Sequence, residues 1–135
     1  MNKDEIEGAK HFPASEVVDE SSTVVKERPK ALAGVTYRVK TGVGKLYITV
    51  NELDGKPFEV FATIGKSGKS VTAKAEAIGR MVSLLLRSGV AVDKIVDQLK
   101  GIGGEHPLPD GDDLVLSIPD GVAKILEGYS HKGGE

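Results

Sequence analysis

The sequence predicts an α+β domain in which an antiparallel meander of three strands packs on two to three helices. Apolar residues alternate with polar ones across residues 35–64, which is the period of a half-buried strand. After residue 70 the apolar spacing becomes helical, and glycine-rich turns separate the segments. A length of 135 residues suits one domain, and 39% hydrophobic content is ordinary for a globular protein.

Three strands account for the alternating stretch. They are expected over residues 35–39, 46–50 and 58–64, each with its apolar residues on one face. The sequence TGVG makes the first turn, and Asp54-Gly55 makes the second because glycine tolerates a positive φ. Short connections indicate antiparallel neighbours with one side facing the core. Core packing is the expected role of the aromatic residues on these strands, Tyr37, Tyr47, Phe58 and Phe61.

The first helix is expected directly after the third strand. Ser70 is a suitable N-cap and Gly89 a suitable residue just beyond the end. Gly79 lies inside the helix, where glycine costs about 1 kcal/mol against alanine, so close packing against it is expected. The inner face carries apolar residues at helical spacing: Val71, Ala75, Ile78, Val82, Leu85 and Leu86.

Two shorter helices complete the predicted domain. One covers residues 92–99 and ends before Gly101, and a loop rich in glycine, proline and aspartate follows. Residues 114–116 form a brief strand, which makes the meander four-stranded if it joins the sheet. Ser117 is expected to cap the last helix, with Pro119 in its first turn.

The ends of the chain differ from its middle. Residues 1–27 mix acids, serine, threonine and isolated valines without a period, which predicts a disordered N-terminal arm. Residues 28–129 form the single predicted domain, and residues 130–135 a flexible tail. No signal peptide and no membrane span is visible, so a cytoplasmic protein without a membrane partner is expected.

Composition excludes several kinds of chemistry. No cysteine is present, which excludes disulfides, thiolate zinc sites and thiol catalysis. With 18 basic and 20 acidic residues the net charge is −2, so no global basic field recruits nucleic acid. The loop with Glu105, His106, Asp110, Asp112 and Asp113 matches no calcium-loop spacing and is interpreted as a solvated acidic loop. No catalytic residue, cofactor or metal is therefore predicted.

The segment TIGKSGKS is the most suggestive local feature. It ends a strand and opens a helix, which is the context of a phosphate loop, but the first glycine of that motif is missing because residue 63 is threonine. A nucleotide-hydrolysing loop is therefore rejected. The free N–H groups and dipole of the helix start still favour an anion there. The predicted phosphate site is Lys66, Ser67, Gly68, Lys69 and Ser70; a solvated glycine loop is the alternative.

Two arginines on the first helix are further candidates. Arg80 and Arg87 lie seven residues apart and share a face, which suits bidentate binding of phosphates or carboxylates. Ordinary solubility, with Glu76 paired to Arg80 at i, i+4, is the favoured alternative. Arg80 lies more than two turns beyond Ser70, so it joins the phosphate site only if the fold or a neighbouring subunit brings it there.

A longer series of motifs resembles a known family. The stretch RPKALAGVTYRVKTGVGKLYITVNELDGKPFEVFATIGKSG, followed by AEAIGRMVSLLLRSGV and DQLKGI, is similar to the C-terminal region of adenosylcobalamin-dependent (class II) ribonucleotide reductases. That region carries the TSCPD domain, which also occurs alone in small proteins. The likeness runs from Arg28 to Leu126 and implies a connection to nucleotide metabolism.

The chain departs from the family pattern at its cysteines. The TSCPD signature appears as LSIPD at residues 116–120, with Ile118 where the cysteine belongs. Gly103-Gly104 stands where the family often places another cysteine. The reductase barrel, its radical-forming cysteine and its cobalamin site are not in the sequence. Cysteine-based reduction therefore cannot operate here, and Ile118 is interpreted as a core residue.

These observations predict a non-catalytic module that binds a nucleotide or another phosphate-bearing small molecule. It would act beside a separately encoded reductase or sequester a nucleotide, as a phage-encoded sponge for a nucleotide signal would. The alternative is a structural or assembly protein without a small-molecule ligand. A three-stranded sheet leaves two edges that invite pairing, and a small domain gains from burying a second surface, so a homo-oligomer is expected.

Overall fold

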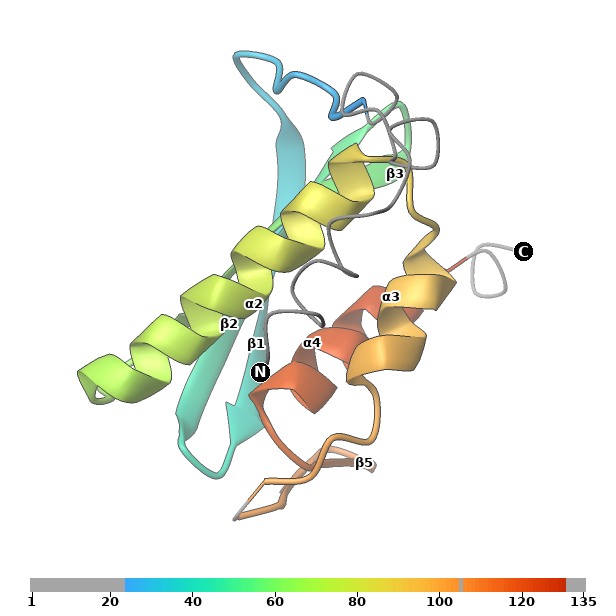
Figure 1. Ribbon diagram of the computed structural model, residues 1–135. Helices are drawn as coiled ribbons and strands as arrows, with labels where there is room; N and C mark the ends of the chain where they lie inside the picture. The colour runs from blue at the N-terminus through green and yellow to red at the C-terminus, as the bar shows by residue number, and fades with distance from the viewer. Residues whose placement is uncertain (1–23, 105, 131–135) are drawn as a thin grey trace, which may run out of the picture.

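The computed structural model describes residues 24–104 and 106–130. Its elements follow the order of the chain (Figure 1): β1 Ala33–Thr41, β2 Gly44–Leu53, β3 Lys56–Ile64, α2 Lys69–Arg87, α3 Val92–Leu99, β4 Leu108–Asp110, β5 Asp113–Val115 and α4 Ile118–Glu127. The predicted α+β class is confirmed, with three strands in the main sheet and three helices among the described residues.

The main sheet is an antiparallel meander in the order β1-β2-β3. Leu46, Ile48 and Val50 of β2 are fully buried, so this strand has the inner face that its alternation predicts. Val39 at the end of β1 is buried too, but Val35 on the same face is 49% exposed. The described helices therefore cover the hairpin end of β1 and leave the opposite end open.

The two short strands do not join the meander. β4 and β5 pair only with each other, so the predicted fourth strand belongs to a separate two-stranded sheet. Asp110 and Asp113 are opposite each other in the register, and Gly111 between them has a φ of +63°. A two-residue turn with glycine at a positive φ closes a local hairpin, and this local pairing takes the place of pairing with the sheet.

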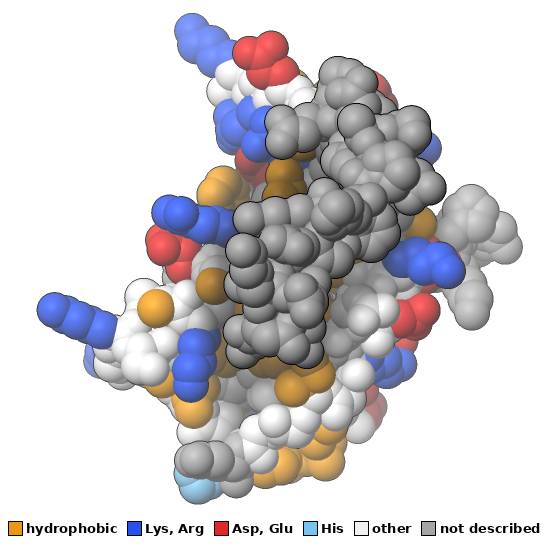
Figure 2. All heavy atoms as spheres, in the orientation of Figure 1, with side chains coloured by type: hydrophobic (Ala, Val, Ile, Leu, Met, Phe, Trp, Pro, Cys, Tyr) orange, Lys and Arg blue, Asp and Glu red, His pale blue; other side chains and the backbone are white. Residues whose placement is uncertain are grey.

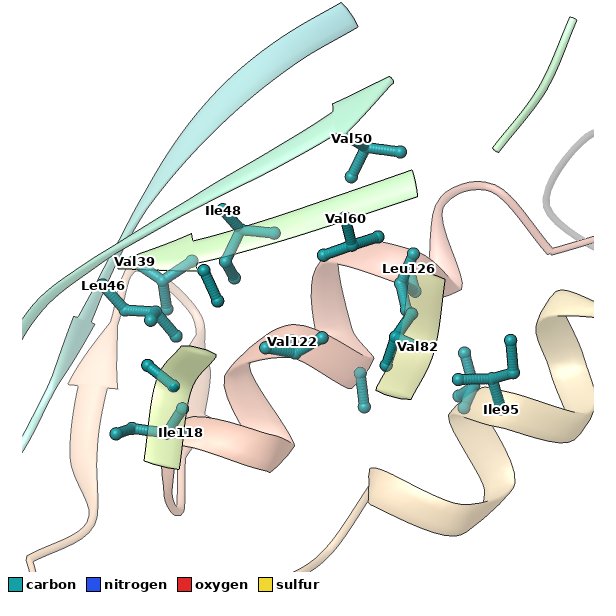
Figure 3. Packing of buried hydrophobic residues seen from close by; sticks show 14 of the residues in the cluster. Val39, Leu46, Ile48, Val50, Val60, Val82, Ile95, Ile118, Val122 and Leu126 are labelled. Atoms are coloured by element: carbon teal, nitrogen blue, oxygen red, sulfur yellow. The ribbon is translucent and has the colours of Figure 1, made fainter. Parts of the chain in front are cut away.

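The helices form a layer on the inner face of the sheet. Helix α2 crosses β3 at Gly79, where an added Cβ would lie 3.1 Å from the carbonyl oxygen of Val60. This confirms the close packing that a mid-helix glycine indicates. Helix α4 contacts β1 and β2 and packs on α3. Figure 3 shows the result: Ile48 and Leu46 face Ile118 and Val122 of α4 across an apolar core.

The helix ends only partly follow the sequence prediction. Gly89 and Gly101 follow α2 and α3 with φ values of +87° and +83°, as predicted for residues just past a helix end. Ser117 caps α4, and its side chain accepts the N–H of Asp120. The prediction that Ser70 caps α2 is wrong: the N-cap is Gly68, so Ser70 lies inside the first turn.

The predicted N-terminal arm lies largely outside the described residues, as does the tail after residue 130. Within the described part, the backbone N–H of Lys26 donates to the carbonyl oxygen of Arg87 at 2.9 Å. The Nε of Arg87 donates back to the carbonyl oxygen of Lys26 at 2.8 Å. Among the described residues no helix is both long and apolar enough to cross a membrane.

Candidate functional site

The predicted phosphate loop connects the end of β3 to the start of α2. The N–H of Gly65 donates to the carbonyl oxygen of Lys45 at 3.1 Å, which holds the loop against β2. A Cβ added to Gly65 would lie 3.6 Å from Cε2 of Tyr47. The loop therefore lies at the hairpin end of the sheet, with Lys45 next to it in space as well as Lys66 and Lys69 in sequence.

The start of α2 is open to solvent. Gly68 is extended, with φ −69° and ψ 165°, and no side chain caps the helix. The first turn contains no acidic residue, while Lys69 is its first residue. Lys66, Gly68, Lys69 and Ser70 are exposed and Ser67 is half-buried. The positive end of the helix dipole is therefore surrounded by lysine and left without a negative charge from its own first turn.

Figure 2 shows Lys and Arg side chains gathered around the left-hand end of the molecule, where α2 begins. The structure thus brings together Lys66, Ser67, Gly68, Lys69 and Ser70 as one exposed segment. It does not bring Arg80 to them, because Arg80 lies ten positions after Ser70 in the helix, about 15 Å along the axis. Arg80 is 79% exposed at its side chain and lies 3.7 Å from Glu76, the i, i+4 pair that the alternative reading predicts.

The guanidinium of Arg87 is held by contacts within the protein. It lies over the ring of Phe58, with its central carbon 5.5 Å from the ring centroid, and its Nε is bonded to Lys26. The two arginines of α2 therefore do not form a shared anion clamp within one chain.

A large cleft among the described residues lies elsewhere. It has a volume of about 730 Å³ and is lined by the β2–β3 turn, the end of α2 and the start of α3, including Lys56, Phe58 and Asp93. Tyr129 also lines it, and burial raises the pKa of this phenol, as does its hydrogen bond with Tyr37 at 2.5 Å. The cleft is at the opposite end of α2 from the phosphate loop, and no predicted site residue lines it.

The acidic loop shows no metal site in its described part. Asp110 and Asp113 flank the tip of the β4–β5 hairpin, and Glu105 lies outside the described residues. The described residues contain no group of three or more histidine, aspartate, glutamate or cysteine side chains placed to hold a metal ion.

A buried carboxylate that sequence reasoning did not single out ties the start of α4 to residues 101 and 116. Asp120 is 1% exposed and accepts hydrogen bonds from the N–H groups of Gly101 and Leu116, both at 2.9 Å, and from Lys124 at 2.8 Å. Burial works to raise the pKa of Asp120, but the hydrogen bonds from Leu116, Lys124 and Gly101 outweigh it and hold the pKa below its ordinary value. The i, i+4 spacing of Asp120 and Lys124 was the available signal.

A second buried carboxylate lies on the other face of the sheet. Glu59 is 3% exposed and is bound bidentately by Arg28, with N–O distances of 2.8 and 3.0 Å. Asn51 donates to the same carboxylate at 2.6 Å. Burial favours the neutral acid, yet the hydrogen bonds from Arg28 and Asn51 lower the pKa of Glu59 overall. Both groups are satisfied internally, which favours a structural role over catalysis.

Fold and site define a small α+β domain with an exposed, uncapped helix start and no thiol. The sequence model of the TSCPD domain matches residues 18–130, and the chain therefore belongs to the TSCPD domain family, whose domain is found at the C-terminus of class II ribonucleotide reductases. Neither the curated proteins nor the solved structures include a match to this chain.

The structure places Ile118 and Gly103-Gly104 at the positions where the family resemblance implies cysteines. Ile118 is 7% exposed and belongs to the core, as predicted. The glycine segment packs beside it, since a Cβ added to Gly104 would lie 2.7 Å from the carbonyl oxygen of Leu116. Ser117 donates from Oγ to the carbonyl oxygen of Ile102 at 2.6 Å. The two segments, residues 101–104 and 116–120, thus lie side by side, joined by the hydrogen bond from Ser117 to Ile102 and by that from Gly101 to Asp120.

Proposed function

We propose that the chain is a non-catalytic module that binds a nucleotide or another small molecule with a phosphate group at the start of α2. The observation that carries the proposal is the helix start itself, which has no side-chain cap and no first-turn acid and is flanked by Lys66 and Lys69. A phosphate placed there accepts hydrogen bonds from the N–H groups that have no carbonyl partner within the helix, and its charge neutralises the lysines.

Family membership supports the choice of a nucleotide. The TSCPD domain accompanies an enzyme that acts on nucleotides, and this chain carries none of the cysteines that reduction needs. Binding without conversion is the activity that remains compatible with both facts. The module would serve a separately encoded reductase or hold a nucleotide away from other proteins.

A thermal-shift screen with nucleotides, dinucleotides and cyclic nucleotides tests the proposal directly. A ligand at 100 times its dissociation constant stabilises the folded state by about 2.7 kcal/mol, which such a screen detects. Because much of the attraction is between charges, the affinity of any ligand found is expected to fall as salt rises. No stabilisation by any phosphate compound in the screen would contradict the proposal.

The double variant Lys66→Ala/Lys69→Ala locates the site. Both residues are exposed, so the free energy of unfolding should change by less than about 0.5 kcal/mol. Ligand binding should weaken by roughly 1.5–3 kcal/mol in calorimetry, the usual contribution of charge-assisted hydrogen bonds.

The matched control is Lys56→Ala/Lys94→Ala, which removes two exposed lysines that lie away from the start of α2. Its affinity should stay at the parent value. Since Lys56 lines the large cleft, a loss confined to the control pair would move the ligand there.

Assembly is the second candidate function, and one observation favours it. Helix α2 exposes Met81, Leu84 and Leu85 by 61%, 48% and 36%. Between α2 and α3 lies an apolar groove of about 290 Å³ that includes Met81 and Leu85. Light scattering at high micromolar concentration distinguishes a homo-oligomer from the 14.2 kDa monomer. If this face forms the contact, Met81→Lys/Leu84→Lys should return the monomer with its fold intact.

A further inference from the structure

The outer face of the main sheet is open. Helix α2 packs on β3 and α4 on β1 and β2, all from the inner side, where the apolar core lies. The residues that alternate with the core residues therefore point away from the described helices. At one end of this outer face Arg28 binds Glu59; nearer the β1–β2 hairpin its exposed residues include Arg38, Lys40, Lys45, Tyr47 and Phe61.

Two aromatic rings occupy the middle of the outer face. Tyr47 is 37% exposed and Phe61 is 51% exposed, so the expectation that they pack in the core is wrong, whereas Phe58 is buried and Tyr37 is partly buried as expected. The register pairs Tyr47 with Thr63 and Phe61 with Thr49. The two rings are therefore diagonal neighbours on adjacent strands, about 7–8 Å apart at their backbones.

Cations lie beside Tyr47 and between it and the β1–β2 hairpin. Arg38 is opposite Tyr47 in the register, and Lys40 is opposite Lys45. All three are exposed. Like charges directly opposite each other destabilise a sheet. A bound anion would therefore relieve the repulsion between Lys40 and Lys45. The acid on the outer face of the three strands, Glu59, is already neutralised by Arg28.

We propose that this outer face binds single-stranded nucleic acid, with bases stacked on Tyr47 and Phe61 and phosphates held by Arg38, Lys40 and Lys45. Exposed aromatic rings give a stacking surface that accepts any base, and a row of cations follows the sugar–phosphate backbone. A duplex keeps its bases stacked on each other, so only an unpaired strand can present them to a flat sheet. The net charge of −2 does not oppose this, because the cations are local.

Charge complementarity favours this occupant over a second copy of the chain. Face-to-face pairing of two outer surfaces would bring the lysines and Arg38 of both copies together without an acid between them. A polyanion instead neutralises all three cations at once. The proposal goes beyond the phosphate site of α2, because it uses different residues and a ligand of several nucleotides.

Fluorescence anisotropy with labelled twelve-nucleotide U and dT strands tests the inference on the full chain. Binding is expected with a slope of log affinity against log salt near −2, since each of three phosphate contacts contributes about −0.7 on a single strand. Whichever of the U and dT strands has the lower dissociation constant identifies RNA or DNA as the preferred ligand.

Tyr47→Thr/Phe61→Thr removes both rings and keeps residues that favour strands. Affinity should fall by roughly 5- to 150-fold for each stacked base that is lost. The control Met81→Gln/Leu84→Gln removes two exposed apolar residues from α2 and should leave affinity unchanged. Arg38→Gln/Lys45→Gln should flatten the salt slope, while Arg80→Gln/Lys94→Gln, with the same change in charge, should not.

Three results would overturn the inference. One is the absence of an anisotropy change at high micromolar protein and low salt. Another is equal affinity of the parent and of Tyr47→Thr/Phe61→Thr with circular dichroism showing both folded. The third is a dimer that this variant dissociates, which would assign the face to a second copy. Lys66→Ala/Lys69→Ala leaves the residues of the outer face unchanged. If this variant loses binding of small nucleotides while Tyr47→Thr/Phe61→Thr keeps it, the phosphate site of α2 is tested separately from the single-strand site.

Discussion

The starts of α2 and α4 both contain a serine, but only the start of α4 has a side chain that caps its N–H groups. Each has a serine near its first residue, Ser70 in one and Ser117 in the other. At α4, Ser117 is the N-cap and the third helical residue is the buried Asp120. At α2 the N-cap is Gly68, which has no side chain to accept a hydrogen bond, and the third helical residue is Val71.

The contrast separates a structural helix start from one that can bind a ligand. Asp120 places a negative charge inside the protein at the positive end of α4, so that end has no use for an external anion. The start of α2 has lysines in place of acids and remains exposed. A helix start that the protein does not close by itself is the one available to a phosphate.

Removing Asp120 should give the largest effect on stability. Asp120→Ala leaves Lys124 and the N–H groups of Gly101 and Leu116 without their partner. Breaking a buried charged pair in this way costs about 3–5 kcal/mol of unfolding free energy, measured by urea denaturation. Asp93→Ala, in the first turn of α3, is the matched control and should cost less than about 1 kcal/mol. A loss below 1 kcal/mol for Asp120→Ala would show that the carboxylate is not the tie described above.

Acid should destabilise the folded protein through its two buried carboxylates, Asp120 at the start of α4 and Glu59 on β3. The pKa values of Asp120 and Glu59 are lowered in the folded protein, so both carboxylates contribute stability above the pKa of the unfolded chain. That contribution is lost as pH falls from roughly 4, where unfolded carboxyls titrate, through the lower folded values. Thermal melts of the parent should drop steeply below pH 4.

Asp120→Asn keeps the shape of the side chain and removes its charge. Its melting temperature should be lower than that of the parent at pH 7, and the difference should narrow on acidification. A constant difference from pH 7 to pH 3 would contradict a charged Asp120 in the folded state.

The fold could be predicted from sequence because most of its elements follow from local pattern. Alternation places Leu46, Ile48 and Val50 on one face whatever lies above them, and Gly79 indicates a close contact because a helix rarely keeps glycine without one. The cap of α2 could not be predicted, because Ser70, two residues after Gly68, is an equally suitable N-cap residue by type. The sequence signal that was overlooked is the absence of an acidic residue from the first turn of α2.

The roles of the aromatic and charged residues were harder to predict. Alternation divides a strand into two faces but does not say whether both are covered, and no pattern showed that every described helix packs on one side. Tyr47 and Phe61 were therefore assigned to the core. Long-range partners such as Arg28 and Glu59 lie 31 residues apart, and only the folded chain brings them together.

The two serines give a smaller test of the same contrast. Ser117→Ala removes the oxygen that accepts the N–H of Asp120 at 3.2 Å and its bond to Ile102, and should destabilise the protein by about 1–2 kcal/mol. Ser70→Ala should change the unfolding free energy by less than about 0.5 kcal/mol, because Ser70 is exposed and does not cap α2. Equal losses for the two variants in urea denaturation would remove the distinction between the helix starts.

A small gain in stability is expected when the start of α2 is given a cap. Gly68 is extended and has nothing within 4 Å of an added Cβ, so Gly68→Asp fits without strain and can accept N–H groups of the first turn. The cap and its charge at the dipole should raise the unfolding free energy by roughly 0.5 kcal/mol. The same carboxylate takes the place of a bound phosphate, so nucleotide affinity should fall by about tenfold or more. Gly68→Ala adds a side chain without an acceptor and should keep the affinity. Calorimetry on both variants decides the matter: if Gly68→Asp is more stable and still binds with parent affinity, the phosphate does not bind at this helix start.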